Sequence, residues 1–377
     1  MYKILQTIRQ GKIGGGERHV LDLVRGLDRR QFQSVVLSFS DGPMVSQLRA
    51  QGVTTYVIPT RLPFNPLVAR QVRRIIANEG IDLVHAHGSR AASNVYRAAG
   101  QTQVPLLYTV HGWSFHPSLK PWLFRLRHQA EGFLTDVADR TLLVSRANQA
   151  EGRQYFPLDR SEVVYCGIDT ARFDPTLARP DLRRELGIAE DCTLVGFVAR
   201  MTKQKDPLTL IEAIRLVAQQ TRQVHFLLVG DGELRFDAES KVKEYGLAEQ
   251  VTFTGFRQDV PDVLAALDVY VLPSLWEGLS LAMLEAMCMG KTVLASAVDG
   301  NVEAVTHEQN GLLLPPREPE TLAQAILRVH AAPTWAAQLG QAARQTVLDR
   351  FSLPTMVGNL EGVYRRMLAQ ESLVIGH

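Results

Sequence analysis

The 377-residue sequence predicts two α/β domains in succession, each built on a parallel β-sheet with helices on its faces. Two observations lead to this fold class. Short β-rich runs alternate with amphipathic helical segments along the whole chain, which is the pattern of doubly wound sheets. The alternation is interrupted near residues 165–180, where Gly, Pro and Asp suit a connection between domains. With 46% apolar residues, the chain can bury the cores that two domains require.

The first domain is predicted over residues 1–170, the second over 171–355, and a final amphipathic helix over about 356–377. Strands of the first domain are expected in "YKILQTI", "SVVLSFS", "TTYVIP", "DLVHAHG", "PLLYTVHG" and "RTLLVS". Strands of the second are expected in "TLVGFVAR", "VHFLLVGDG", "VTFTGF", "VYVLPS", "TVLAS" and "GLLLP". Because doubly wound sheets bind ligands outside the carboxyl ends of their strands, the function is expected at those ends.

Charge is unevenly distributed along the chain. The first 175 residues contain 22 Lys and Arg against 14 Asp and Glu, whereas the remainder contains 19 against 25, so the net charge of +2 conceals a basic first half. A basic half indicates either an anionic partner, such as a membrane surface or a phosphate-bearing acceptor, or merely a surplus of solvated arginines. Charge counts alone do not separate these interpretations.

The three cysteines, Cys166, Cys192 and Cys288, are far apart, fit no metal-ligand spacing and are odd in number. We therefore expect neither a metal site nor a disulfide framework, which favours a reducing cytoplasm. The amino-terminal "MYKILQTIRQ" has the pattern of a strand rather than a signal segment, and no window reaches the roughly 18 apolar residues of a spanning helix. The expected location is the cytoplasm.

A glycine run follows the first predicted strand. Gly14, Gly15 and Gly16 in "GKIGGGERHV" open a helix, so backbone amides there can approach an anion closely. The run lacks the full glycine spacing of dinucleotide-binding proteins, which makes a nicotinamide dehydrogenase the weakest functional class. Taken alone, it indicates a tight turn as readily as a ligand site.

Two cations follow the first strand of the second domain, in "GFVARMTKQKDP". Arg200 and Lys205 precede Pro207, which suits the first turn of a helix. Two cations at the carboxyl end of a strand match the two charges of a diphosphate. A solvated loop at a helix start accounts for the same residues.

Two carboxylates lie in the apolar stretch "PSLWEGLSLAMLEAMCMG". A helix beginning near Gly278 or Leu279 is predicted to be buried on all sides, because its other side chains leave no polar face. Burying an unpaired carboxylate costs roughly several kcal/mol. Glu285 must therefore meet a protein cation or the hydroxyls of a ligand, while Glu277 precedes the helix.

Together these features resemble the retaining nucleotide-sugar glycosyltransferases of family 4, which have the GT-B fold. The resemblance is carried by Glu277 and Glu285 with seven residues between them, by Arg200 and Lys205, and by the "GGGER" turn and the "VHG" that contains His111. It extends in order over essentially the whole chain. It implies two Rossmann-like domains facing across a cleft, with the acceptor bound by the first, the donor by the second, and the final helix packed back on the first.

The resemblance also implies roles for single residues. Arg200 and Lys205 would bind the donor diphosphate and stabilise it as leaving group, Glu285 would bind the ribose hydroxyls, and Glu277 would orient the donor sugar. His111 would lie near that sugar and complete the catalytic set. The other donor-side residues would be the amides of Gly278, Leu279 and Ser280, the glycines Gly15 and Gly16 beneath the diphosphate, and the nucleobase loop at Phe256 and Arg257. The chain departs from many relatives at Cys166, where Asn is frequent, and at Asn301.

No Asp-x-Asp sequence of the kind that holds a divalent ion under a diphosphate is present. The charge of the leaving group is therefore expected to be met by Arg200, Lys205 and helix amides, without a metal or any other cofactor. The stereochemical outcome in the family implies that the anomeric configuration of the sugar is retained. The acceptor would then attack on the face from which the diphosphate departs, and a diphosphate oxygen would take the acceptor proton. A UDP-sugar is favoured as donor substrate by its frequency in the family.

Candidates for acceptor binding lie in "VHAHGSRAASN", where His87, Ser89 and Arg90 follow the predicted strand. Like His111, His87 stands at a strand end, where either a cleft residue or a hydrogen-bonded structural histidine is expected. The segment "HGWSFHPSLKPWLFRLRHQAEGF" mixes aromatic and basic residues, which suits docking on the inner face of an anionic membrane. An ordinary helix that buries Trp122 and Phe124 explains the segment equally. The expected acceptor is a saccharide or a lipid-linked saccharide of surface polysaccharide or glycoconjugate synthesis; no nucleic-acid partner is expected.

Two other functions share part of this pattern. A sugar-nucleotide epimerase of the same fold would use the same donor but would need acids suited to proton abstraction or elimination, whereas the spacing of Glu277 and Glu285 with Arg200 and Lys205 favours transfer. A non-catalytic nucleotide-sugar-binding protein would not need the intact charged set. Incubation with donor alone would separate the epimerase from the transferase.

Overall fold

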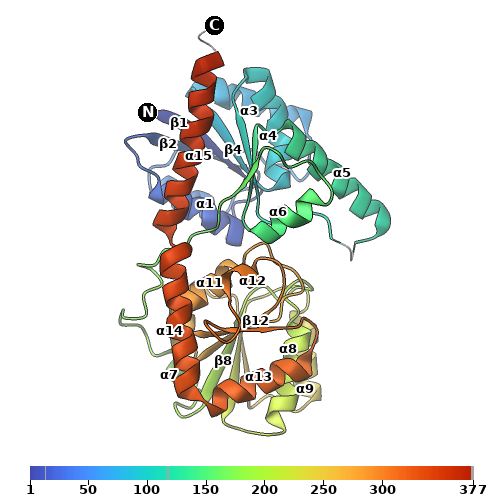
Figure 1. Cartoon of the computed structure of the whole chain (residues 1–377), viewed down its shortest axis with the longest axis vertical. Coiled ribbons are helices and arrows are strands. Elements are labelled where there is room, and N and C mark those ends of the chain that lie inside the picture. Colours follow the sequence, from blue (N-terminus) through green and yellow to red (C-terminus); the bar gives the residue numbers. More distant parts are fainter. Residues whose placement is uncertain (13, 117–118, 375–377) are drawn as a thin grey trace. The chain divides into compact units, whose positions relative to one another are not determined.

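The computed structural model describes residues 1–12, 14–116 and 119–374, with side chains described as far as Ala369 (Figure 1). The chain divides into two compact units. The first unit comprises Met1–Gly167 and Leu353–His377, and the second comprises Ile168–Ser352. Each unit is a parallel β-sheet with helices packed on it, so the predicted fold class of two Rossmann-like domains is confirmed. Among the described residues, no helix combines the length and apolarity needed to cross a membrane.

The first unit has a seven-stranded sheet of order β3-β2-β1-β4-β5-β6-β7, in which every pairing is parallel. Its strands are β1 (Tyr2–Ile8), β2 (Phe32–Ser38), β3 (Thr55–Val57), β4 (Leu83–His87), β5 (Leu106–Val110), β6 (Arg140–Leu143) and β7 (Ser161–Val163). Its helices are α1 (Gly15–Gly26), α2 (Pro43–Ala50), α3 (Pro66–Glu79), α4 (Ser89–Thr102), α5 (Pro121–Val137), α6 (Arg146–Arg153) and α15 (Leu353–Val374). The strand order reverses between β1 and β4, where doubly wound sheets bind ligands.

The second unit has a six-stranded parallel sheet of order β10-β9-β8-β11-β12-β13. Its strands are β8 (Thr193–Val198), β9 (Val224–Val229), β10 (Val251–Gly255), β11 (Val269–Leu272), β12 (Thr292–Ser296) and β13 (Leu312–Leu314). Its helices are α7 (Leu182–Glu185), α8 (Pro207–Ala218), α9 (Arg235–Glu244), α10 (Val260–Ala266), α11 (Leu281–Cys288), α12 (Asn301–Ala304), α13 (Pro319–Ala331) and α14 (Pro333–Arg350). Here the order reverses between β8 and β11, so the loops after these two strands meet at one edge.

Helix α15 belongs to the first unit, although it follows the whole second unit in the chain. Its apolar face joins a buried cluster with Ile4, Phe32 and Leu83 of that sheet. Tyr364 on this face accepts a hydrogen bond from the amide of Gln6 at 3.0 Å. The last three residues of the predicted terminal helix, 375–377, lie outside the described residues.

Candidate active site

The predicted site residues fall into two groups, one at the carboxyl edge of each sheet. In the second unit, the loop after β8 carries Arg200, which is exposed, and Lys205, whose side chain is 14% exposed. Helix α8 then begins behind Asp206, whose side chain caps the helix by accepting from the backbone N–H of Thr209. This cap ends the loop one residue after Lys205.

Glu277 lies in the loop after β11 and is 5% exposed. Its carboxylate forms an ion pair with Lys205 and accepts a hydrogen bond from the Ser274 hydroxyl at 2.6 Å. Its backbone N–H donates to the carboxylate of Asp299 at 2.7 Å. The cation that a buried carboxylate requires is therefore provided by Lys205 from the neighbouring loop.

The two loops are also joined through their backbones. The N–H of Leu275 donates to the carbonyl of Gln204 at 2.8 Å, and the Gln204 side chain donates to the carbonyl of Trp276 at 2.9 Å. Strands β8 and β11 are neighbours, so the loops that follow them run close enough for these bonds. These hydrogen bonds between the two loops hold Lys205 and Glu277 next to each other.

The structure corrects two expectations for α11. The helix begins at Leu281 rather than near Gly278 or Leu279, because the Ser280 hydroxyl accepts from the N–H of Met283 and acts as N-cap. The helix is also not buried all round: Leu281, Ala282 and Glu285 are half-buried. Residues three and four apart share a helix face, so Glu285 lies with Ala282 and Leu281 on the partly open side of α11.

The negative charges of Glu277 and Glu285 both affect the buried phenol of Tyr270. The pKa of Tyr270 is raised well above its ordinary value, first by burial and then by the negative charges of Glu277 and Glu285. Tyr270 lies in β11, directly before the Glu277 loop. The two carboxylates that the sequence singled out thus lie near the carboxyl end of the same strand.

The loop at Glu277 is packed tightly against Gly300. A Cβ atom at Gly300 would lie 2.0 Å from the carbonyl oxygen of Gly278, which no side chain can do without moving the backbone. Replacing Gly300 with Ala is therefore expected to displace the loop and to destabilise the protein by about 1–3 kcal/mol, as overpacking does.

Denaturant unfolding measures this effect, and Gly358→Ala is the matched control. Gly358 is exposed in α15, and an added Cβ there would meet nothing within 4 Å. The control should leave stability unchanged or slightly raised, because Ala favours helix over Gly. Equal stability of the two variants would contradict the close packing of the loop.

The nucleobase candidates after β10 differ in their surroundings. Phe256 is 62% exposed. The guanidinium of Arg257 is held by Asp259 and by Glu185, the latter at 2.9 Å, and these hydrogen bonds raise the pKa of Arg257. The Arg257 side chain is thereby fixed within the second unit, and the assignment of this loop to the nucleobase stays a prediction.

In the first unit, Gly15 and Gly16 are the first two residues of α1, and Gly14 is the N-cap. The N-terminus of α1 thus lies after β1, at the reversal point of the sheet. Gly16 is close to His111: an added Cβ would lie 4.0 Å from the His111 ring. The structure therefore brings Gly16 and His111 together at this edge of the first sheet, while the roles of Gly15, Gly16 and His111 toward the donor stay predictions.

Both predicted histidines belong to one cluster, in which His87 is buried and His111 is half-buried. His87 is the last residue of β4, and its Nδ1 lies 3.3 Å from Nε2 of His111, which follows β5. The Nε2 of His87 lies 2.9 Å from Oε1 of Gln6 in β1. Burial lowers the pKa of His111 to about 4, so its ring is neutral at pH 7.

The remaining acceptor candidates begin α4. The Arg90 guanidinium donates to the carbonyl of Arg61. Ser89 lies close to Tyr108 and Glu131, which share a hydrogen bond of 2.7 Å. Both side chains are thus engaged within the first unit, and their part in acceptor binding stays a prediction.

Several residues of these two groups were not predicted from the sequence. In the second unit they are Ser274 and Asp299, which hold Glu277. In the first unit they are His19, Gln6 and Tyr364. Gln6 carried a usable signal, because it is a polar residue inside the otherwise apolar strand "YKILQTI"; a fully buried amide needs partners.

Comparisons with known proteins agree with this architecture. Residues 13–172 match the family described as Glycosyltransferase Family 4, and residues 178–346 match Glycosyl transferases group 1. The chain is 26% identical over 372 residues to the Escherichia coli UDP-Gal:alpha-D-GlcNAc-diphosphoundecaprenol alpha-1,3-galactosyltransferase, with 95% of each chain covered. It is 30% identical over 295 residues to the 2-deoxystreptamine glucosyltransferase of Streptomyces kanamyceticus, covering 76% of this chain and 71% of the relative.

A similar solved structure is that of Anabaena HepE in complex with UDP-glucose. It superimposes with a TM-score of 0.85 at 27% identity and covers 97% of this chain and 100% of that one. The two family matches together extend over both units, and the matched ranges contain every predicted site residue. The chain therefore belongs to the family 4 glycosyltransferases of group 1.

Proposed function

We propose that this protein is a retaining, metal-independent glycosyltransferase that transfers a sugar from a UDP-sugar to a saccharide or lipid-linked acceptor. The observation that carries the proposal is the buried ion pair of Lys205 with Glu277 at the reversal point of the second sheet. Relatives that use or bind UDP-sugars support the choice of donor, among them the Escherichia coli galactosyltransferase and the HepE complex with UDP-glucose.

Lys205 can serve both Glu277 and the donor. An ammonium group has three N–H donors, and the pair with Glu277 uses one direction, so others remain for diphosphate oxygens. The exposed Arg200 adds a second cation from the same loop. Together they stabilise the negative charge that grows on the diphosphate as the glycosidic bond breaks, which is charge stabilisation without a metal ion.

The sugar is then received by the acceptor hydroxyl on the face that the diphosphate leaves. The new bond joins the anomeric carbon to the acceptor oxygen, the old bond to the diphosphate oxygen breaks, and the acceptor proton passes to that departing oxygen. Glu277 orients the donor sugar through its fixed carboxylate. A contact of His111 with the donor sugar stays a prediction; the His111 ring is neutral at pH 7, because burial lowers its pKa to about 4.

A ligand screen tests the donor assignment. UDP and UDP-sugars are expected to raise the melting temperature more than GDP or GDP-sugars, because a ligand that binds only the folded protein stabilises it by mass action. Arg200→Ala should remove much of that rise. Equal shifts with all nucleotides, or none with UDP, would contradict the donor proposal.

Product analysis tests the reaction. With UDP-sugar and acceptor, NMR of the product is expected to show the anomeric configuration of the donor, and added EDTA should leave the rate unchanged. UDP-sugar incubated without acceptor should remain the same sugar. Its epimerisation would instead establish the rival activity.

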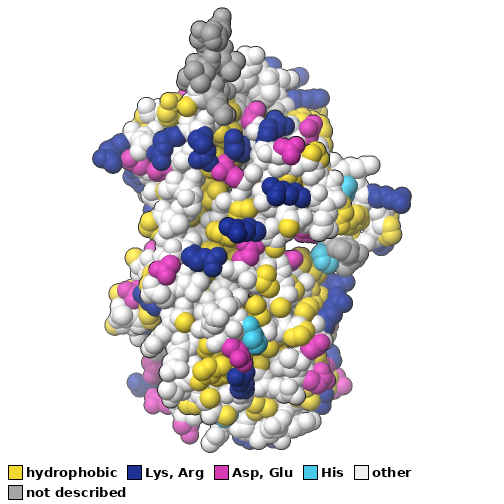
Figure 2. Space-filling model, in the orientation of Figure 1, with side chains coloured by type: hydrophobic (Ala, Val, Ile, Leu, Met, Phe, Trp, Pro, Cys, Tyr) yellow, Lys and Arg dark blue, Asp and Glu magenta, His cyan; other side chains and the backbone are white. Residues whose placement is uncertain are grey.

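We also propose that α5 brings the protein to an anionic membrane that carries the acceptor. Trp122 and Leu126 lie one helical turn apart and are 64% and 57% exposed, and Arg125 and Arg127 beside them are exposed as well. Exposed aromatic and aliphatic groups interleaved with cations suit a membrane interface. The view in Figure 2 shows many Lys and Arg side chains over the first unit, in keeping with the basic first half of the sequence.

Vesicle sedimentation is expected to show binding to anionic vesicles at low salt, weaker binding at high salt, and little binding to neutral vesicles. Replacing Trp122 and Leu126 together with Ser should reduce binding at least tenfold, because both apolar anchors are lost. The matched control is Phe236→Ser, which changes a 77% exposed aromatic residue of α9 in the second unit. Equal loss in both proteins, or no binding by the parent, would refute membrane docking through α5.

A further inference from the structure

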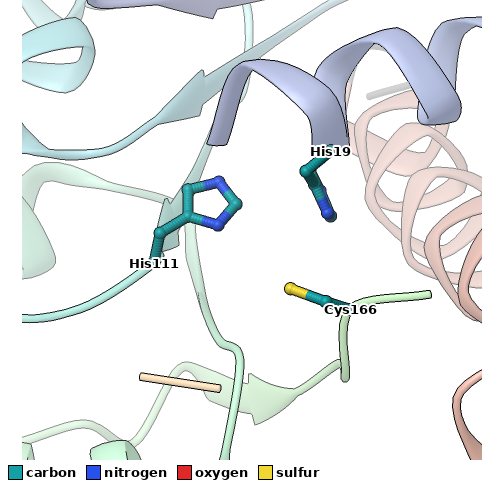
Figure 3. A group of neighbouring side chains, drawn as sticks. All are labelled: His19, His111 and Cys166. Atoms are coloured by element: carbon teal, nitrogen blue, oxygen red, sulfur yellow. The ribbon is translucent and has the colours of Figure 1, made fainter. Parts of the chain in front are cut away.

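Three side chains of the first unit converge beside the histidine cluster: His19 of α1, His111 after β5, and Cys166 in the segment after β7 (Figure 3). Their potential ligand atoms all lie within 4.8 Å of one another. Figure 3 shows the two rings and the thiol directed toward a common space. The transfer reaction described above uses only His111 of the three.

His19 is the unusual member of the group. Its side chain is 5% exposed, and among the described residues neither of its ring nitrogens has a hydrogen-bond partner. A buried polar group without a partner costs about 1–3 kcal/mol, and an imidazole always carries at least one donor or acceptor to satisfy. His85, by contrast, has both nitrogens bonded, to Tyr364 and Thr109 at 2.7 Å each.

His111 has the surroundings that a ligating histidine needs. Its Nε2 is engaged by His87, and His87 is held in turn by Gln6. Ligating imidazoles usually hydrogen-bond through the nitrogen that does not bind the metal, which sets ring orientation and tautomer. This arrangement leaves Nδ1 of His111 for coordination. His111 is also only half-buried, so the cluster has one side open to a fourth ligand.

We propose that His19, His111 and Cys166 form a binding site for a divalent transition-metal ion of the zinc type. Two imidazole nitrogens and one thiolate are a borderline-soft donor set that suits zinc, and three protein ligands with an open fourth position for water are a common zinc arrangement. In a tetrahedral site the donor atoms lie about 3.3–3.6 Å apart, so the side chains must close by about 1 Å. Binding converts the Cys166 thiol to a thiolate and releases its proton to solvent.

Cobalt(II) binding tests the proposal without any assay of activity. The purified full-length protein, stripped with a chelator, is expected to bind one Co²⁺ per chain at this site and to develop a thiolate-to-cobalt charge-transfer band, which zinc should remove by displacement. Cys166→Ser and His19→Gln should each lose the band and weaken zinc binding at least tenfold. Cys288→Ser is the matched control, since Cys288 is equally buried but lies in the second unit.

A thermal melt establishes whether each variant is folded, and zinc should raise the melting temperature of the parent but not of folded Cys166→Ser. If Cys166→Ser does not fold, the band in the parent and its loss in His19→Gln still decide the matter. No charge-transfer band in the parent, or an unchanged band in folded Cys166→Ser or His19→Gln, would overturn the proposal.

One consequence rests on the proposed function. A metal ion that holds His111 withdraws this ring from the donor sugar, so zinc is expected to inhibit transfer by the parent and to spare any activity of Cys166→Ser. The cobalt spectrum reports the site directly. A spectrum that shows coordination while transfer continues undiminished would therefore refute the role of His111 in transfer and leave the metal site established.

Discussion

Replacing Lys205 with Met is expected to lower kcat/KM by about 10²–10³-fold, because the donor diphosphate loses a preorganised cation that acts on the developing charge. The same change should destabilise the protein by about 3–5 kcal/mol, since it leaves the buried carboxylate of Glu277 without its counter-ion. Initial-rate kinetics and denaturant unfolding measure the two effects separately.

A double variant distinguishes the catalytic role of Lys205 from its structural one. Lys205→Met combined with Glu277→Gln removes the stranded charge while keeping an oxygen for the hydrogen bond from Ser274. Stability should largely return, whereas kcat/KM should stay well below that of Glu277→Gln alone, because the single variant keeps the cation of Lys205. Equal kcat/KM of the double variant and of Glu277→Gln alone would show that Lys205 only supports Glu277 and does not act on the donor.

Lys241→Met provides the matched control for this experiment. Lys241 pairs with Glu212 at 2.6 Å in the same unit, and both side chains are more exposed than those of Lys205 and Glu277. Loss of a partly exposed pair costs about 1 kcal/mol or less. Its kcat/KM should equal that of the parent.

Acidification is expected to destabilise the protein through His85. This ring is fully buried between Tyr364 and Thr109, and burial, assisted by the charge of His111, lowers its pKa to about 3. In the unfolded chain the histidine titrates near pH 6.5. Between pH 6.5 and 3 the unfolded state therefore binds more protons than the folded state, so stability falls as pH falls.

The loss attributable to His85 is about 2 kcal/mol between pH 7 and pH 5. It is measured as a difference: unfolding free energies of the parent and of His85→Gln are compared at both pH values. The parent should lose about 2 kcal/mol more than the variant, whatever the other groups contribute to both proteins. An identical pH dependence of parent and variant would show that His85 is not held neutral.

Some features of the fold could be predicted because they depend on residues that are close together in the sequence. The alternation of β-rich runs with amphipathic segments predicted the two parallel α/β domains, since strand and helix periods are properties of neighbouring residues. Strand β7 was not predicted: it has only three residues, all half-buried, and so lacks the apolar run that marks an interior strand. The start of α11 was misplaced because the decisive signal is one hydroxyl, that of Ser280, within an apolar stretch.

In the candidate site, too, some features could be predicted from the sequence and others could not. Arg200, Lys205 and Glu277 could be selected from the sequence because each follows a recognisable strand, and such ends are where these sheets bind ligands. The pairing of Lys205 with Glu277 could not be predicted from the sequence, because 72 residues separate them. Only the pairing of β8 with β11 brings their loops together.

By itself the sequence determined the fold class, the strand ends that carry charge and the membership in a transferase family, because these depend on short-range pattern and on order along the chain. The tertiary structure alone decided which groups lie close enough to share a hydrogen bond, an ion pair or the proposed metal ion. His19, His111 and Cys166 show why: no ligand spacing links them, yet sheet order and the return of the chain after β7 place them within 4.8 Å of one another. Coordination and ion pairing depend on distances in space, which sequence separation does not encode.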